Sequence, residues 1–213
     1  MSRVRKFSFY GLLIFYSVLT IVPFLWSLST SFKPSEEVYQ SNLIPEAATM
    51  KAYATVFGKI QPNFQTLFAN SLFIACVVVV LHLIFAALAG YAFARLRFPG
   101  RDVLFFVVLG CMMIPDQLRL VPMYQLLVKM GLINEGPSNY LAIFLIKAIS
   151  AADVFLMRQY FLTMPKEMED AAKIDGAGPF QLFWRVMLPN AAPVLATVAI
   201  LTFQGTWNDL FWP

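Results

Sequence analysis

The feature that most constrains the fold is an uncharged apolar run from Ser71 to Ala94. As an α-helix these residues would extend roughly 35 Å, which is enough to cross the ~30 Å hydrocarbon core of a bilayer. The whole chain is 59% hydrophobic and only 13% charged, whereas soluble domains carry about 25% charged residues. The sequence therefore predicts an all-α membrane protein built as a polytopic helix bundle, with residues 1–213 forming one transmembrane domain.

Four further apolar segments are candidates for membrane spans. They cover residues 9–32, 103–127, 140–161 and 191–212. Pro115 should break or bend the second of these segments. The first is longer than the roughly 7–15 apolar residues of a signal peptide, so we interpret it as a retained helix. Residues 33–68, which follow it, are predicted to form an exposed loop that carries short helices.

Small and weakly polar residues inside these segments predict how the helices pack. Ala86, Gly90 and Ala94 recur every four positions and predict a face on which another helix packs closely. His82 is the only histidine, and we expect it to hydrogen-bond to a neighbouring helix. The two cysteines lie within apolar runs, so the sequence predicts no disulfide, no metal site and no cofactor.

Lys147 and Asp153 place charges at membrane depth in the fourth span. Such charges are costly in a bilayer and face the bundle interior or a water-filled cavity. On one helix the two side chains would point about 240° apart, so we expect each to find a separate partner. With Gln204 and Asn208 they are candidates for contact with a transported solute. For any one of the four, hydrogen bonding between helices is the simpler role.

Five spans would place the connecting segments alternately on the two sides of the membrane, and the lysines and arginines are unevenly divided between those sides. Residues 1–8, 95–102 and 158–190 hold ten lysines and arginines, whereas residues 33–67 and 116–139 hold five. By the positive-inside rule the denser side is cytoplasmic, which places the amino terminus and residues 158–190 there. The net charge of +4 lies in short clusters beside apolar runs and forms no nucleic-acid-binding patch.

Residues 163–190 form the one long polar interruption that is itself patterned to fold. Pro165 suits a first helical position, and acidic residues follow it at the positive end of the helix dipole. Gly176 suits the left-handed residue that ends such a helix. Gly178-Pro179 should begin a second helix, which Leu188-Pro189 should end. On these grounds alone, the segment is an amphipathic hairpin at the membrane surface, which needs no partner.

The same residues resemble a known motif. Asp170 to Ala177 reads DAAKIDGA and is followed by Phe183 and Leu188-Pro189. This is similar to the EAA loop in the membrane subunits of ATP-binding-cassette (ABC) importers that work with a binding protein, and most similar to the carbohydrate-uptake permeases, such as the second membrane subunit of the maltose transporter. GYAFARLRFPGR and FLMRQYF extend the resemblance along the chain. Asp170 stands where the family usually has Glu, which keeps the charge and shortens the side chain.

The resemblance implies a permease subunit in a bacterial or archaeal plasma membrane, forming half of the path for a sugar or related polyol. It also implies three kinds of partner: cytoplasmic ATPase subunits, a second permease subunit and an extracytoplasmic solute-binding protein. The residues it assigns to ATPase coupling are Glu169, Asp170, Ala171, Ala172, Asp175, Gly176, Ala177, Phe183, Leu188 and Pro189.

Two other functions are open on the residues alone. No G-x-x-x-x-G-K-[ST] loop occurs in the sequence, so we expect no ATPase activity in this chain and do not expect it to be an enzyme. One alternative is an ion-coupled transporter or channel that uses Lys147 and Asp153 as a relay. Another is a membrane scaffold that only packs against other helices. Energy coupling to an ATPase would distinguish the permease subunit from the ion-coupled transporter and from the scaffold.

The carboxyl end also carries a resemblance. WNDLFWP, residues 207–213, is similar to the family segment that leads into a further outer loop and a last helix. The sequence therefore suggests a chain that is truncated before a sixth span. Trp207 and Trp212 are placed as an aromatic belt at the membrane interface.

Overall fold

The computed structural model describes residues 3–133 and 138–210. It is built from helices, and no strand occurs in these two ranges, which confirms the all-α class. The chain divides into two compact units, Met1–Phe68 and Ala69–Pro213. Within the described residues, two helices are long and apolar enough to cross a membrane, and up to five spans result if each of three bent helix pairs counts as one.

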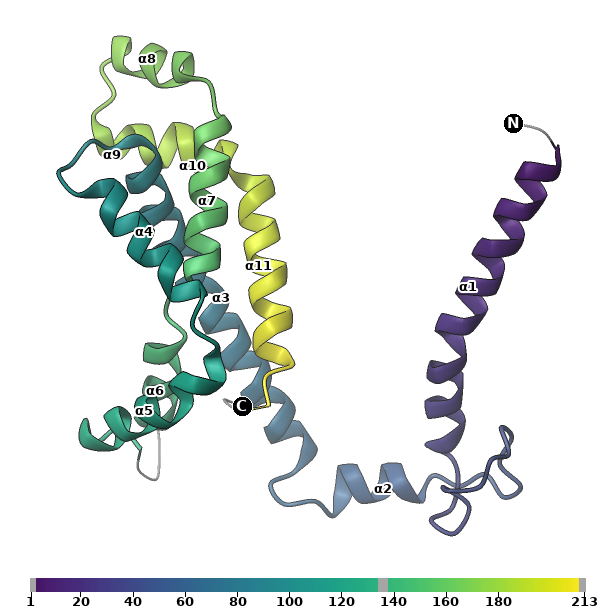
Figure 1. Ribbon diagram of the computed structural model, residues 1–213. Helices are drawn as coiled ribbons and strands as arrows, with labels where there is room; N and C mark the ends of the chain where they lie inside the picture. The colour runs from purple at the N-terminus through teal and green to yellow at the C-terminus, as the bar shows by residue number, and fades with distance from the viewer. Residues whose placement is uncertain (1–2, 134–137, 211–213) are drawn as a thin grey trace. The chain divides into compact units, whose positions relative to one another are not determined.

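The first unit contains a long helix followed by a locally folded loop. Its helices are α1 (Arg3–Thr30) and α2 (Lys51–Gly58), and α3 (Phe64–Arg95) begins in it (Figure 1). Lys33 fixes the loop after α1, because its buried ammonium group donates to the carbonyl oxygens of Gln40 at 3.1 Å and Asn42 at 2.5 Å. A loop carrying short helices was predicted over residues 33–68; the structure has one short helix there, α2, and residues 64–68 belong to α3.

The second unit is a helix bundle with a small helical segment at one end. After α3 its elements are α4 (Arg101–Met112), α5 (Asp116–Lys129), α6 (Ser138–Ile146), α7 (Ala151–Thr163), α8 (Lys166–Ile174), α9 (Pro179–Gln181), the π-helical stretch η1 (Leu182–Met187), α10 (Leu188–Asn190) and α11 (Ala192–Trp207). α7 contacts both α4 and α11, and α8 contacts η1. Figure 1 shows α8 at one end of this bundle, with α5 and α6 toward the other.

The break in the third span was predicted from the sequence, and the break in the fourth was not. The third span is broken before Pro115, and α4 and α5 are inclined by 101°, as predicted. The fourth was predicted as one helix over residues 140–161, which is wrong, because residues 147–150 separate α6 from α7 with a 46° bend. Lys147 therefore lies in the break.

The fifth helix ends at Trp207, and Trp212 lies outside the described residues.

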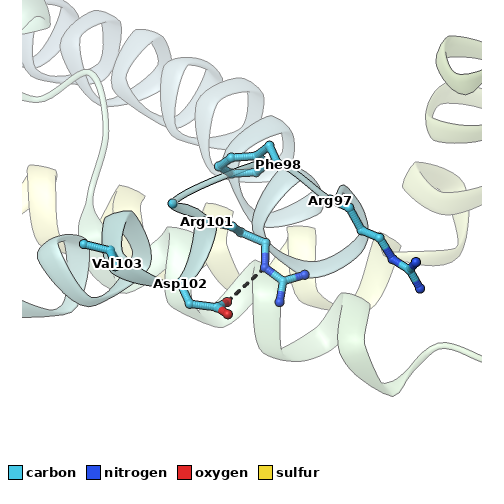
Figure 2. Close-up of a pocket in the computed structure, with 6 residues that line it drawn as sticks. Arg97, Phe98, Arg101, Asp102 and Val103 are labelled. Atoms are coloured by element: carbon cyan, nitrogen blue, oxygen red, sulfur yellow. Dashed lines mark hydrogen bonds and ion pairs between the residues drawn. The ribbon is translucent and has the colours of Figure 1, made fainter.

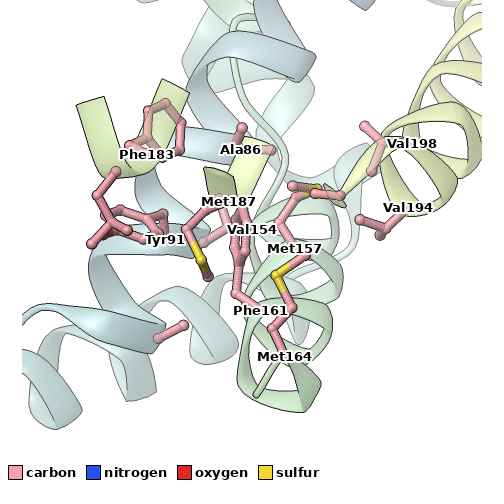
Figure 3. Packing of buried hydrophobic residues seen from close by; sticks show 14 of the residues in the cluster. Ala86, Tyr91, Val154, Met157, Phe161, Met164, Phe183, Met187, Val194 and Val198 are labelled. Carbon is pink, nitrogen blue, oxygen red and sulfur yellow. The ribbon is translucent and has the colours of Figure 1, made fainter. Parts of the chain in front are cut away.

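A hydrophobic core joins the helical segment at the end of the bundle to the spans beneath it. Figure 3 shows Tyr91 of α3 among Phe161 and Met157 of α7 and Phe183 and Met187 of η1. The ring centroids of Tyr91 lie 5.7 Å from Phe161 and 5.0 Å from Phe183, within the range of favourable aromatic pairs. Because η1 shares the core of α3 and α7, the segment after α8 is part of the bundle.

The predicted row of small residues lies where α3 meets α7. Ala86 is fully buried and Ala94 nearly so. A Cβ atom added at Gly90 would lie only 2.5 Å from the Cβ atom of Met157 and 2.9 Å from the backbone nitrogen of Arg158. Only glycine permits this close approach, and the prediction of a close helix-packing face is confirmed.

We expect Gly90→Ala to destabilise the bundle by about 1–3 kcal/mol, because the added methyl group overlaps the backbone of α7. The matched control is Gly205→Ala in α11, where an added Cβ meets nothing within 4 Å and alanine raises helix propensity. Thermal unfolding of the purified protein in detergent measures both variants. Equal stability of the two variants would contradict the close contact.

Candidate functional site

The segment predicted as a helix, a turn and a second helix has that structure. α8 ends at Ile174, and Gly176, two residues later, has a φ of +81°, so this glycine occupies the left-handed region after the helix as predicted. The Gly176 amide donates to the Lys173 carbonyl oxygen at 3.0 Å, and the Ala177 amide donates to the Ala172 carbonyl oxygen at 2.9 Å. These two bonds form a Schellman motif, and they fix the direction in which the chain leaves α8.

The second helical stretch begins at Pro179 as predicted, but it ends later. It continues through Pro189 to Asn190, so the prediction that Leu188-Pro189 ends it is wrong by one residue. The stretch before the proline is π-helical, with the Leu188 amide donating to the Phe183 carbonyl oxygen five residues back. This widened turn lies just before Pro189, which lacks the N–H that a regular helix needs. The chain then bends by 72° into α11.

α8 has an inward and an outward face that divide the predicted coupling residues. Glu169 and Ala172 point inward and are each 9% exposed. The remaining members fall into three groups by burial: buried Phe183, half-buried Ala177 and Leu188, and exposed Asp170, Ala171, Asp175, Gly176 and Pro189. Five of the ten are thus accessible to a partner. The other five lie wholly or partly within the chain's own packing.

Glu169 is held by Arg95, the last residue of α3. The Arg95 Nε and Glu169 Oε1 atoms lie 3.0 Å apart, and their side chains are 7% and 11% exposed. A terminal nitrogen of the same guanidinium group donates to the carbonyl oxygens of Phe161, at 2.6 Å, and Met164 at the end of α7. One arginine therefore connects α3, α7 and α8. Removing one partner of such a buried ion pair costs about 3–5 kcal/mol.

The outward side of the segment exposes large apolar side chains that the sequence analysis did not single out. Ile174 is 87% exposed, Phe180 is 74% exposed and Trp184 is 48% exposed. Ile174 follows Ala172 by two positions and so points about 200° away from it on the helix, but the burial of Ala172 was not predicted. Apolar side chains that gather on an otherwise polar segment indicate a contact surface.

A second polar cluster lies inside the bundle and connects three helices. The His82 Nδ1 and Asp153 Oδ2 atoms lie 2.6 Å apart, and the Thr202 hydroxyl lies 3.2 Å from the same nitrogen. The His82 Nε2–H donates to the Lys147 carbonyl oxygen at 2.7 Å. Since a carbonyl only accepts, Nε2 carries a hydrogen. α3, α7 and α11 thus meet at His82, which confirms its predicted contact with a neighbouring helix.

Lys147 and Asp153 have separate partners, as predicted. The Lys147 ammonium group forms an ion pair with Asp209, just after α11, while Asp153 pairs with His82. Asn208 donates to the Gln204 carbonyl oxygen of its own helix at 2.8 Å, and Gln204 lines an outer groove of about 530 Å³ with Cys76 and Phe203. A role of Lys147, Asp153, Gln204 and Asn208 in contacting solute stays a prediction.

Metal binding has no support in the part of the chain that the structure describes. No group of three or more histidine, cysteine or acidic side chains within it is placed to hold a metal ion. Cys76 and Cys111 are free thiols exposed on their helices.

Helices long and apolar enough to cross a membrane, joined to a folded helical segment at one end, define a polytopic membrane protein. Residues 83–213 match the family "Binding-protein-dependent transport system inner membrane component". The chain belongs to this family and is a permease subunit of an ABC importer. It is a transporter subunit of the inner membrane, as predicted, and family membership favours this class over an ion-coupled transporter or a scaffold.

Named relatives and a solved structure agree with this assignment. The chain is 36% identical over 203 residues to the arabinooligosaccharides transport system permease protein AraQ of Halalkalibacterium halodurans, covering 93% of this chain and 71% of the relative. It is 34% identical over 218 residues to the diacetylchitobiose uptake system permease protein NgcG of Streptomyces coelicolor, covering 100% and 70%. It resembles a chain of a bacterial ABC transporter that imports the acidic polysaccharide alginate, with a TM-score of 0.81, 30% identity, and coverage of 98% of this chain and 73% of that chain.

A double-mutant cycle on His82 and Asp153 tests the cluster inside the bundle. We expect His82→Ala and Asp153→Ala to be strongly non-additive, with a coupling energy of about 1.5–3 kcal/mol, because either single change leaves the other polar group buried without its partner. The control cycle uses Asp116 and Arg119, which form an exposed ion pair whose coupling should be about 0.5 kcal/mol. Unfolding of the purified protein in detergent measures both cycles, and additive losses at His82 and Asp153 would contradict the contact.

Proposed function

We propose that this permease subunit forms half of the translocation path for a sugar or related polyol, and that α8 couples it to an ATPase that supplies the energy. The solute class is supported by relatives whose names specify the transport of arabinooligosaccharides, diacetylchitobiose and trehalose. ATP hydrolysis is assigned to a partner, since no phosphate-binding loop of the usual type occurs in this sequence.

The observation that carries the proposal is that α8 is fixed to the bundle on one face and exposed on the other. Its inward Glu169 is paired with Arg95, while its outward side presents Asp170 and Ile174 to solvent. A force applied to the exposed side therefore reaches α3 and α7 through the ion pair, with little freedom for α8 to move alone. This is the mechanical requirement for a coupling element between two conformations.

The proposed docking surface consists of the outward residues of the segment. It comprises the acidic residues Asp170 and Asp175, the small residues Ala171 and Gly176, and the apolar residues Ile174 and Phe180. The small side chains at 171 and 176 let a partner backbone approach, while Ile174 and Phe180 supply apolar area for a groove. Glu169, Ala172, Ala177, Phe183 and Leu188 contribute by holding this surface in place. Pro189 is exposed at the end of the segment.

The remaining partners and the orientation follow from the same function. A second permease subunit would complete the path, and a solute-binding protein would deliver the sugar on the outer side. The density of cations in residues 1–8, 95–102 and 158–190 supports a cytoplasmic amino terminus and a cytoplasmic α8. Residues 163–190 act as the coupling loop of one transmembrane domain that covers residues 1–213.

Copurification followed by transport in vesicles tests the proposal. We expect an ATPase subunit to copurify with this chain, and the reconstituted complex to take up sugar only when ATP is supplied on the α8 side. Uptake that a protonophore abolishes, and that needs no ATPase, would instead support an ion-coupled transporter. Absence of both the ATPase and any uptake would leave a scaffold as the better account.

Gly176→Val should uncouple ATP hydrolysis from uptake while leaving membrane insertion intact. Valine is strained at a φ of +81°, so the turn after α8 must change direction. The matched control is Gly178→Val, because Gly178 has a φ of −71° and an added Cβ there meets nothing within 4 Å. Uptake per ATP hydrolysed should fall by about tenfold or more for Gly176→Val only, if the change costs about 1.4 kcal/mol of coupling. Normal uptake by this variant would contradict the docking role.

Glu169→Gln should loosen α8 from the bundle, since Arg95 would keep its buried charge without an acidic partner. We expect lower uptake per ATP hydrolysed, with a loss of stability of up to about 3–5 kcal/mol. The control is Glu167→Gln, the same chemical change at an exposed position of the same helix. Both variants are assayed below their unfolding temperatures. Equal coupling in the two variants would show that the Arg95–Glu169 pair does not transmit the movement.

A further inference from the structure

A basic hollow lies at the turn between α3 and α4, beside the α8 end of the bundle. Its volume is about 490 Å³, and it is lined by Arg97, Phe98, Gly100, Arg101, Asp102 and Val103. Gly100 has a φ of +79°, which folds the turn back so that α4 begins directly after it. Figure 2 shows the Arg97 and Arg101 side chains extending from this turn on the same side. The hollow plays no part in the coupling proposed for α8.

The hollow has cationic groups that the protein leaves available. Arg97 is exposed and has no ion-pair partner within residues 3–133 and 138–210. Arg101 donates through Nε to the Asp102 carboxylate at 2.9 Å, and Nη1 reaches the Leu96 carbonyl oxygen at 3.5 Å, which is too long for a strong bond. The terminal nitrogens of both guanidinium groups can therefore bind an additional anion.

The surface next to the hollow is apolar. On α4, Val103 is 69% exposed, Leu104 is 51% exposed and Phe106 is 71% exposed. The turn also follows directly after α3, which is long and apolar enough to span a membrane. The end of such a helix lies at the depth of the lipid headgroups, where phosphate groups meet acyl chains. Cations beside an exposed apolar face match a molecule that combines an anionic headgroup with a hydrocarbon tail.

We propose that Arg97 and Arg101 form a binding site for the headgroup phosphate of an anionic phospholipid, whose acyl chains lie along α4. Guanidinium groups suit this role because their planar donors bind phosphate oxygens in pairs. Asp102 orients Arg101 through its Nε and leaves the other donors toward the hollow. A lipid is favoured over free phosphate because the exposed face of α4 continues the site as an apolar surface.

Lipid titration of the purified transporter complex tests the proposal, with native mass spectrometry to count bound molecules. The probes are phosphatidylglycerol, phosphatidylcholine and glycerol phosphate. We expect wild type to bind phosphatidylglycerol in preference to phosphatidylcholine. Arg97→Gln should weaken phosphatidylglycerol binding about fivefold, and Arg97→Gln with Arg101→Gln about 25-fold, since each arginine near a membrane surface contributes about that factor. Phosphatidylcholine binding should not change.

The controls separate this site from general surface charge. Arg119→Gln removes an exposed arginine that is already paired with Asp116, so it should leave phosphatidylglycerol binding unchanged. Arg97→Lys should retain part of the affinity by keeping the charge. Equal binding of phosphatidylglycerol by wild type and the double variant would overturn the proposal, as would equal losses in Arg119→Gln. Glycerol phosphate that binds as tightly as the lipid would show a soluble-anion site instead. None of these results depends on whether α8 docks an ATPase.

Discussion

The contact between α3, α7 and α8 at one end of the bundle depends on the side chain of Arg95. Arg95 is the last residue of a 32-residue helix, α3. Its side chain is 7% exposed, and an unpaired charge buried to that extent is costly. Glu169 neutralises it from α8, and two carbonyl groups at the end of α7 accept hydrogen bonds from one of its terminal nitrogens. The Arg95 side chain therefore connects the end of α3 to the end of α7 and to α8. A helix of nine residues that would be marginal alone becomes a rigid part of the protein.

The bilayer imposes a related constraint deeper in the bundle. Charged and polar groups there are paired across helices: His82 with Asp153 and Thr202, and Lys147 with Asp209. Hydrophobic contact alone gives little preference for one helix arrangement over another inside lipid, so such pairs specify which helices meet. Lys147 makes two such contacts, one through its backbone carbonyl group and one through its ammonium group. The carbonyl group is available because Lys147 lies in the break between α6 and α7, where no hydrogen bond within a helix occupies it.

Local signals predicted much of this architecture. The uncharged run over residues 71–94 predicted α3 through its hydropathy. Pro115 predicted the break between α4 and α5, and Gly176 predicted the end of α8, because each restricts or permits a particular local backbone conformation. The partners of Arg95, Lys147 and His82 could not be predicted, because they lie 62 or more residues away along the chain and a single sequence carries no information on that pairing. The break at residues 147–150 was missed for the same reason, since the distant His82 and Asp209 stabilise it. The exposure of Ile174 could not be predicted, because it depends on the burial of Ala172 on the opposite side of α8, and the resemblance to the EAA loop had assigned Ala172 to ATPase coupling.

The proposed coupling requires a separate ATPase subunit to bind the exposed face of α8. Its most direct measurement is site-specific crosslinking from position 174, with Ile174→Cys in a background where Cys76 and Cys111 are replaced by serine. Membranes that contain the whole transporter should give a crosslink between position 174 and an ATP-hydrolysing subunit, and a reagent confined to the cytoplasmic side should label the new thiol. Labelling from the outer side only, or the absence of any crosslink to such a subunit while the thiol stays reactive, would contradict the account.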